Sequence, residues 1–192
     1  MHIKIYDWVM GLASHRNAIW FLSFIAFIES SFFPIPPDIM LIPMILAVRQ
    51  DAWKIAFFCM ISSVLGGIGG YGIGYYFFEL IGSELLEIYN YGLKFDQFQS
   101  TYDAWGAWVV FFAGLTFFPY KVITILSGVM GLNLPIFIIS SILARGIRFF
   151  VIAWLLWKFG DMIQDFIYRR LGVIFIVFCL LLISGFIIIK FI

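Results

Sequence analysis

The sequence predicts an all-α integral membrane protein, a polytopic helical bundle with two inverted re-entrant helical hairpins. Of its 192 residues, 64% are hydrophobic, 21% are aromatic and only 12% are charged, whereas a soluble domain is about half apolar and a quarter charged. Several apolar runs reach the length of about 20 residues that a helix needs to cross a bilayer. Two further apolar segments are interrupted by proline at matching places in the two halves of the chain.

The first part of the chain is expected to form a surface helix at residues 1–16 and a re-entrant hairpin at residues 17–48. Residues 1–16 mix apolar and charged side chains, which is typical of an amphipathic helix that lies on a membrane surface. The segment 17–48 is too long for one simple span. Its helix should break at prolines, which lack a backbone donor and clash with the preceding turn. These prolines are Pro34, Pro36 and Pro37.

The rest of the chain is expected to alternate full spans with a second broken segment. Residues 52–78, 134–157 and 171–192 are each apolar and long enough to cross a bilayer as one helix. Residues 79–103 mix acidic and apolar side chains, which predicts a partly helical loop along the membrane interface. Residues 104–133 predict a second re-entrant hairpin.

The two broken segments resemble each other. Each contains Phe-Phe-Pro, ending at Pro34 and at Pro119, then a charge, Asp38 or Lys121, and then a second apolar stretch. The match needs a two-residue gap before the charge. Discontinuous apolar segments at corresponding places in two halves of a membrane protein predict a transporter binding site.

The basic residues predict the orientation. If both broken segments enter and leave on one side, most basic residues gather on the side of the N-terminus. That side would hold Lys4, Arg16, Arg49, Lys54, Lys158, Arg169 and Arg170, and the other side Lys94 and Lys190. Positive residues favour the cytoplasmic side, so the N-terminus is predicted to be cytoplasmic and the hairpins inverted. If the hairpins were ordinary spans, the basic residues of the first three loops would divide between the two sides.

Five charged residues lie inside apolar segments: Glu29, Asp38, Lys121, Arg145 and Arg148. A charge in hydrocarbon costs at least about 2.5–3.5 kcal/mol, so such residues usually face a bundle interior and have a function. Arg145 and Arg148 share one helix face and suit phosphate or carboxylate, and Lys121 adds a third cation. These three are the predicted phosphate-binding residues. Glu29 and Asp38 are the predicted proton- or ion-coupling residues, since desolvation favours a protonated carboxyl.

Two structural alternatives remain for these charges. Asp38 can be simply the N-cap of the returning half-helix, a position that aspartate prefers. The two carboxylates can also pair with the arginines and lock the bundle, although a buried ion pair is a weak stabiliser.

The run from Gly66 to Gly74 contains G-x-G-x-x-G. No βαβ context surrounds it, so a nucleotide site is not expected. Its small-xxx-small spacing instead predicts close helix packing at Gly66, Gly70 and Gly74.

An enzyme is not expected. The only histidines are His2 and His15, and no Cys/His cluster could hold zinc. A pair of Ser127 and Lys121 remains formally open as a nucleophile and base. No cofactor and no metal are expected, and the net charge of +1 predicts no nucleic-acid partner.

The motif FIESSFFPIPPD, from Phe27 to Asp38, resembles the signature of the DedA family, bacterial membrane proteins that share the VTT (SNARE-associated Golgi protein) domain. The run GGYGIGYYFFELIG is similar to the glycine-rich helix that follows in that family. FFPYKVITILSGVMG resembles the second hairpin, closest to the YqaA-like branch. The resemblance covers roughly residues 19–160.

The resemblance implies two inverted re-entrant hairpins and lipid transport across the bacterial inner membrane, dependent on the proton-motive force. Implied cargoes are phospholipids or undecaprenyl phosphate. The essential acids of the family would fall on Glu29 and Asp38. Many members have arginines around the second proline, where this chain has Thr116 and, nearly, Lys121, and Arg145 and Arg148 could substitute for them.

The sequence thus predicts a multi-pass flippase or scramblase whose partners are anionic membrane lipids and protons, with a homo-oligomer left open. The alternatives are a proton-coupled transporter of a small solute and a membrane assembly factor that transports nothing.

Overall fold

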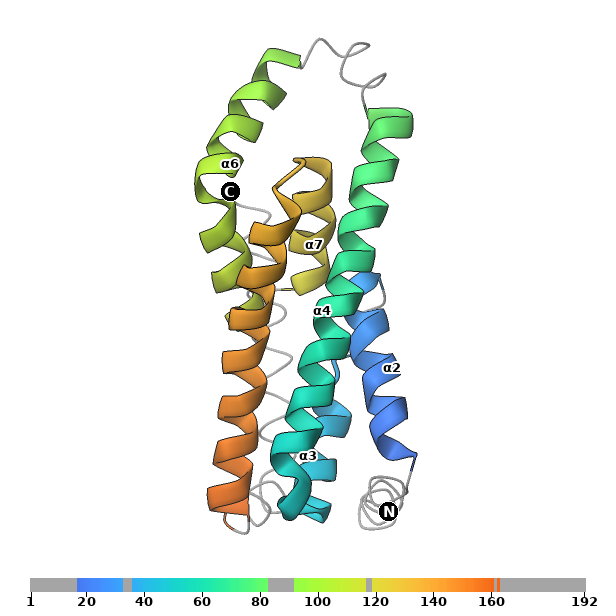
Figure 1. The fold of residues 1–192 in the computed structure, drawn as a ribbon, viewed down its shortest axis with the longest axis vertical. Coiled ribbons are helices and arrows are strands. Elements are labelled where there is room, and N and C mark those ends of the chain that lie inside the picture. The colour runs from blue at the N-terminus through green and yellow to red at the C-terminus, as the bar shows by residue number, and fades with distance from the viewer. Residues whose placement is uncertain (1–16, 33–35, 83–91, 117–118, 161, 163–192) are drawn as a thin grey trace, which may run out of the picture.

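The computed structural model describes residues 17–32, 36–82, 92–116, 119–160 and 162, and every regular element in that part of the chain is a helix. The all-α fold class is therefore confirmed for the described residues. In chain order the elements are α2 (Ala18–Ser31), α3 (Asp38–Ala47), the 3-10 turn η1 (Arg49–Asp51), α4 (Ala52–Phe77), the π-helical turn η2 (Phe78–Gly82), α6 (Gly92–Leu115), α7 (Tyr120–Val129) and the helix Leu134–Gly160 (Figure 1).

Two of the described helices are long and apolar enough to cross a membrane. One runs continuously from Arg49 to Leu80 with a mean hydropathy of 1.6, and the other is Leu134–Gly160 with a mean hydropathy of 2.0. They coincide with the spans predicted at residues 52–78 and 134–157. The surface helix predicted at 1–16 and the span predicted at 171–192 lie outside the described residues.

Helices α2 and α3, and helices α6 and α7, form two antiparallel pairs that point toward each other. In Figure 1, α2 runs from the lower end of the molecule to its middle, and α3 returns to the lower end. From the upper end, α6 runs to the middle and α7 returns. Pro37 directly precedes α3 and Pro119 directly precedes α7. Because proline lacks a backbone donor, the chain begins a new helix at these points.

One boundary differs from the sequence expectation. Helix α6 begins at Gly92, inside the segment 79–103 that was expected to be a partly helical interfacial loop. The first arm of the second pair is therefore a long helix of 24 residues, and the acidic residues Asp96 and Asp103 lie on it rather than in a loop. Charged side chains are compatible with this helix because Asp96 and Asp103 are exposed there.

Helix α4 contacts both helix pairs through its glycines. A side chain at Gly66 would meet the backbone of Phe27 in α2, and one at Gly74 would meet the backbone of Ile125 in α7. Between them, Gly70 lies against Thr124 of α7 and the carbonyl oxygen of Ser30. Small residues let helix backbones approach closely, so α4 holds the two pairs against a single face.

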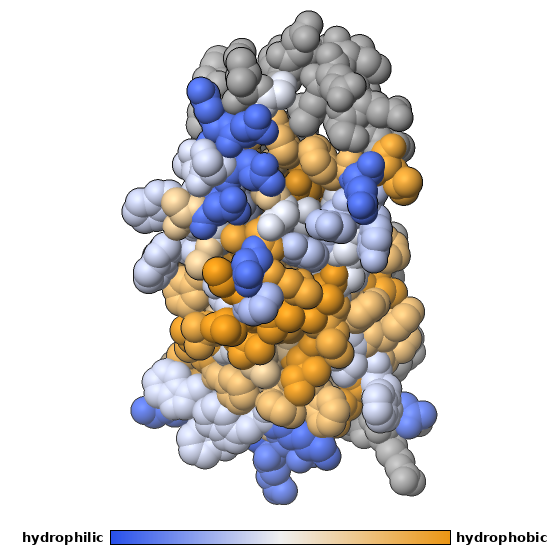
Figure 2. Space-filling view, turned by 45° about the horizontal axis from the view of Figure 1, so that its top comes forward, coloured by the Kyte–Doolittle hydropathy of each residue, from blue (hydrophilic) through white to orange (hydrophobic). Residues whose placement is uncertain are grey.

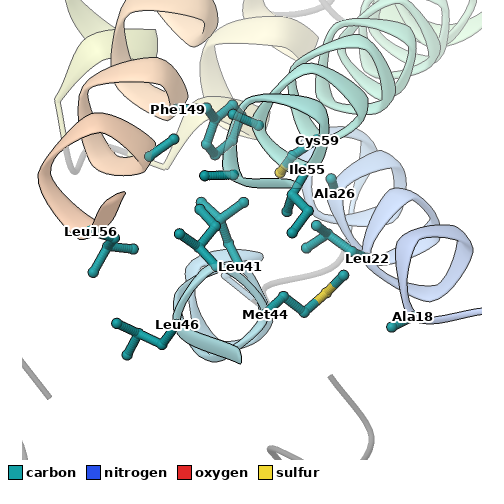
Figure 3. Close-up of a cluster of buried hydrophobic side chains, with 14 residues drawn as sticks. Ala18, Leu22, Ala26, Leu41, Met44, Leu46, Ile55, Cys59, Phe149 and Leu156 are labelled. Carbon is teal, nitrogen blue, oxygen red and sulfur yellow. The ribbon is translucent and has the colours of Figure 1, made fainter. Parts of the chain in front are cut away.

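The core consists of two clusters of buried side chains. Figure 3 shows the first, in which side chains of α2, α3 and α4 meet Phe149 and Leu156 of the helix Leu134–Gly160. The second joins α6 and α7 to the start of that same helix, with Val110, Tyr120 and Phe137 fully buried. The long helix therefore crosses from one cluster to the other.

The outside of the molecule is strongly apolar. The face in Figure 2 carries a hydrophobic region across its middle, with hydrophilic residues toward both ends. Large exposed side chains include Trp20 (71%), Phe24 (60%) and Ile139 (59%). Soluble monomers rarely expose continuous apolar patches of more than a few hundred Å², so this surface is suited to contact with lipid.

Candidate functional site

Two arginines on one turn of the helix Leu134–Gly160 form the centre of the site. Arg145 and Arg148 are three residues apart and therefore lie on the same helix face. Each contacts a carboxylate of the pair α2–α3, Arg145 with Glu29 and Arg148 with Asp38. Four of the five charged residues predicted as functional are thus brought together as two ion pairs.

The first ion pair is long. Arg145 Nη2 lies 3.4 Å from Glu29 Oε2. The same carboxylate oxygen accepts a hydrogen bond of 3.0 Å from Ser30 Oγ, which is also 2.7 Å from Ser63 Oγ of α4. Arg145 is only 1% exposed, so a guanidinium is buried here beside a carboxylate in the last turn of α2.

The second ion pair is short. Arg148 Nη2 donates to Asp38 Oδ2 at 2.5 Å, and Nη1 donates to the carbonyl oxygen of Thr116 at 2.9 Å. Asp38 is the first residue of α3, where free N–H groups and the helix dipole stabilise an anion. Thr116 follows the last residue of α6, where carbonyl groups and the dipole favour a cation. Arg148 therefore joins the start of α3 to the end of α6.

Tyr120 is a site residue that the charge pattern does not reveal. The guanidinium carbon of Arg145 lies 3.9 Å from the centroid of the Tyr120 ring, a cation–π contact. The Tyr120 hydroxyl donates to Ser141 Oγ at 2.5 Å. The signal that could have found it is its place between Pro119 and Lys121, at the predicted tip of the second hairpin.

The two arginines together contact all four arms of the helix pairs. Arg145 meets Glu29 at the end of α2 and Tyr120 at the start of α7. Arg148 meets Asp38 at the start of α3 and Thr116 at the end of α6. Each arginine therefore contacts one arm of each helix pair.

Other predicted residues lie apart from these contacts. Within the described residues, the partly buried Lys121 side chain forms no ion pair or hydrogen bond with either carboxylate. Pro36 is exposed and Pro37 is buried just before α3, Pro119 is exposed before α7, and Pro34 lies outside the described residues. Gly66, Gly70 and Gly74 lie on the face of α4 toward α2 and α7.

Two buried polar atoms of the site have no hydrogen-bond partner among the described residues: Arg145 Nε and Asp38 Oδ1. Buried polar atoms are normally paired, and an unpaired one requires an explanation such as a ligand or water. In the described part of the chain no three His, Cys, Asp or Glu side chains gather that could hold a metal ion. The available chemistry is recognition of an anion by guanidinium groups, which fit phosphate and carboxylate.

The fold and site define a helical protein with two candidate membrane-crossing helices and two partly buried arginine–carboxylate pairs. The chain is 42% identical over 149 residues to an uncharacterized protein from Haemophilus influenzae, a match covering 78% of this chain and 77% of that one. It is 40% identical over 151 residues to an uncharacterized protein from Histophilus somni, covering 79% and 78%. The chain belongs to the family of these two proteins. No family model and no solved structure matches it.

Proposed function

We propose that the protein is a flippase or scramblase that moves an anionic lipid, such as a phospholipid or undecaprenyl phosphate, across the bacterial inner membrane. The observation that carries the proposal is the set of two arginine–carboxylate pairs at the tip of α2–α3, whose arginines also contact the facing tip of α6–α7. Ionisable residues inside a membrane segment usually mark a transport path. Broken helices at matching places in two halves usually mark its binding site.

The apolar exterior and the two long apolar helices support an integral membrane protein. In this proposal the pairs α2–α3 and α6–α7 are re-entrant hairpins that enter the bilayer from opposite sides. The predicted span 171–192 completes a multi-pass topology with a cytoplasmic N-terminus. The resemblance to the DedA family supports the same topology and the same class of cargo.

In the proposed mechanism, the positive charge of Arg145 and Arg148 attracts an anionic head group, which competes with a carboxylate for a guanidinium. Lys121, in the first turn of α7, adds positive charge at the neighbouring tip. A carboxylate that loses its arginine in an apolar site favours the protonated form, which would couple lipid movement to protons. The lipid tails stay in the bilayer while the head group passes between the hairpins.

The test is reconstitution of the full chain in liposomes that contain fluorescent phospholipids or a labelled polyprenyl phosphate. The expected result is accelerated exchange of at least one of these lipids between the leaflets. No acceleration for either lipid, with protein insertion verified, would reject the lipid proposal.

Two substitutions test the role of the ion pairs. Glu29→Gln and Arg148→Ala should each abolish exchange, because each removes one charge of a partly buried pair and leaves its partner uncompensated. Lys158→Gln is the matched control, since Lys158 is an exposed cation near the end of the same helix. Full exchange in Glu29→Gln or Arg148→Ala, or lost exchange in the control, would contradict these roles.

A second candidate is a membrane assembly factor in which the charges only lock the bundle. The pairing of four of the five charges favours it. Exchanging the charges of one pair, Glu29→Arg with Arg145→Glu, distinguishes the two functions. If the pair only locks the bundle, the protein should remain stable after this charge swap. An anion site should instead lose its cation, and the movement of lipid between the leaflets should be lost with it.

A further inference from the structure

We propose that the two ion pairs have different roles: Arg145 binds the anion, whereas Asp38 and Arg148 form a latch between the helix pairs. The inference rests on the proposed function and names the group at which its cargo would bind. The two arginines lie on one turn of the same helix but have unlike partners.

Both terminal nitrogens of Arg148 already donate hydrogen bonds to the helix pairs. Nη2 donates to Asp38 at 2.5 Å and Nη1 to the Thr116 carbonyl at 2.9 Å. Charge-assisted N–H···O bonds are typically about 2.7–2.9 Å long, so neither contact is loose. An anion at Arg148 would have to break the joint between α3 and α6. This arrangement suits a latch better than an exchange site.

The guanidinium group of Arg145 can form further hydrogen bonds. Its contact with Glu29 is 3.4 Å long, beyond the usual range for a charge-assisted bond. The oxygen that it contacts already accepts a hydrogen bond from Ser30. Its Nε is buried and has no hydrogen-bond partner among the described residues. Nε and Nη2 lie along one edge of the planar guanidinium, and two parallel N–H groups match two oxygens of a phosphate.

Tyr120 positions Arg145 for this role. Its ring lies against the guanidinium at 3.9 Å, and its hydroxyl is anchored to Ser141. Two glycines leave room for the ring, since a Cβ at Gly67 would lie 3.1 Å from the Tyr120 hydroxyl and one at Gly114 would lie 3.4 Å from the ring. A flat cation stacked on an aromatic face does not use its N–H groups in that contact, and such preorganisation lowers the entropic cost of binding.

The closing experiment compares the two arginines with one probe, the short-chain lipid dihexanoyl phosphatidic acid, titrated calorimetrically into the purified full chain in detergent. Arg145→Lys keeps the charge but loses the planar fork, so Kd should rise at least about tenfold. The double variant Asp38→Asn, Arg148→Gln removes both charges of the second pair together, so neither charge is left uncompensated. There Kd should rise less than about threefold, and Lys158→Gln should match the unmodified chain.

Tyr120→Leu is a second variant, which keeps every charge of the site and is used if Arg145→Lys does not fold. It should raise Kd about three- to tenfold, and Tyr120→Phe, which keeps the ring, should restore most of the affinity. Equal losses in the Arg145 variant and the double variant would overturn the division of roles. So would unchanged affinity in Arg145→Lys, or no binding of the probe by the unmodified chain.

Lipid exchange in vesicles separates this inference from the proposed function. A chain that binds the probe through Arg145 but exchanges no lipid would contradict transport and leave the division of roles standing. A chain that exchanges lipid while both arginine variants lose equal affinity would support transport and overturn the division.

Discussion

At the scale of residues, the burial of Arg145 dominates the chemistry of the site. Its guanidinium is removed from water, and it lies against the Tyr120 ring, 5.8 Å from the Phe149 centroid and 3.4 Å from Glu29. Removing one partner of a buried ion pair costs about 3–5 kcal/mol, because the other charge is left uncompensated. The rings and the carboxylate therefore stabilise the charge of Arg145 together.

A double-mutant cycle should reveal the coupling between Tyr120 and Ser141. Tyr120→Phe and Ser141→Ala each remove one partner of the buried hydrogen bond and should each lower the free energy of unfolding by about 1–3 kcal/mol. The double variant should cost less than the sum, because both variants break the same bond. Unfolding in detergent measures the four free energies, and strictly additive losses would contradict the bond.

At the scale of elements, α4 is the helix that brings the two helix pairs into contact. Its glycines lie against the backbones of α2 and α7, and Thr124 of α7 donates a hydrogen bond of 3.1 Å to the Ser30 carbonyl of α2. The pairs therefore meet each other on the surface of α4. Any side chain added on this face must separate one pair from the helix.

Two glycines of α4 provide a matched test of this packing. In Gly74→Ala the new methyl group meets the Ile125 backbone, whereas at Gly72 no atom lies within 4 Å. Overpacking should make Gly74→Ala destabilising by about 1–3 kcal/mol. Gly72→Ala should stabilise the protein by up to about 1 kcal/mol, since alanine is the better helix former. Thermal unfolding in detergent compares them, and equal effects would show that Gly74 does not hold α7.

At the scale of the whole molecule, basic residues gather where one end of each long helix lies beside the other. Arg49, at the start of the first, lies against Gly160 at the end of the second, so these ends are neighbours. Lys54 and Lys158 lie near the same end. Positive residues favour the cytoplasmic side of a membrane, so this end should be cytoplasmic and the turn at Gly131 should be on the other side.

Cysteine labelling tests this orientation. In a background with Cys59→Ala and Cys179→Ala, Asn133→Cys should react with a membrane-impermeant thiol reagent in intact cells. Gln50→Cys should react only after the membrane is opened, because Gln50 lies beside Arg49. Both positions are exposed. Labelling of Gln50→Cys in intact cells would reverse the orientation, and labelling of both from one side would contradict a membrane-crossing α4.

Much of the site could be predicted because charges in apolar segments are conspicuous. Glu29, Asp38, Arg145 and Arg148 stand out for this reason, and the spacing of the arginines places them on one face. Tyr120 could not be found in this way. It is one of nine tyrosines in a chain with 24 phenylalanines and seven tryptophans. Its place beside Pro119 is the one sequence signal, and its contact with Arg145 is visible only in the tertiary structure. Residues 79–103 were expected to be partly helical, but the start of α6 at Gly92 could not be located, because these residues mix acidic and apolar side chains without a clear break.

The sequence by itself determined the all-helical class, the two long apolar helices and the breaks near Pro37 and Pro119. These follow from composition and from the missing backbone donor of proline, which are local properties. Only the tertiary structure decided which carboxylate meets which arginine, that Lys121 joins neither pair, and that Tyr120 stacks on Arg145. Those contacts join residues as far apart as 116 positions. They depend on how closely the glycines of α4 let the two helix pairs approach.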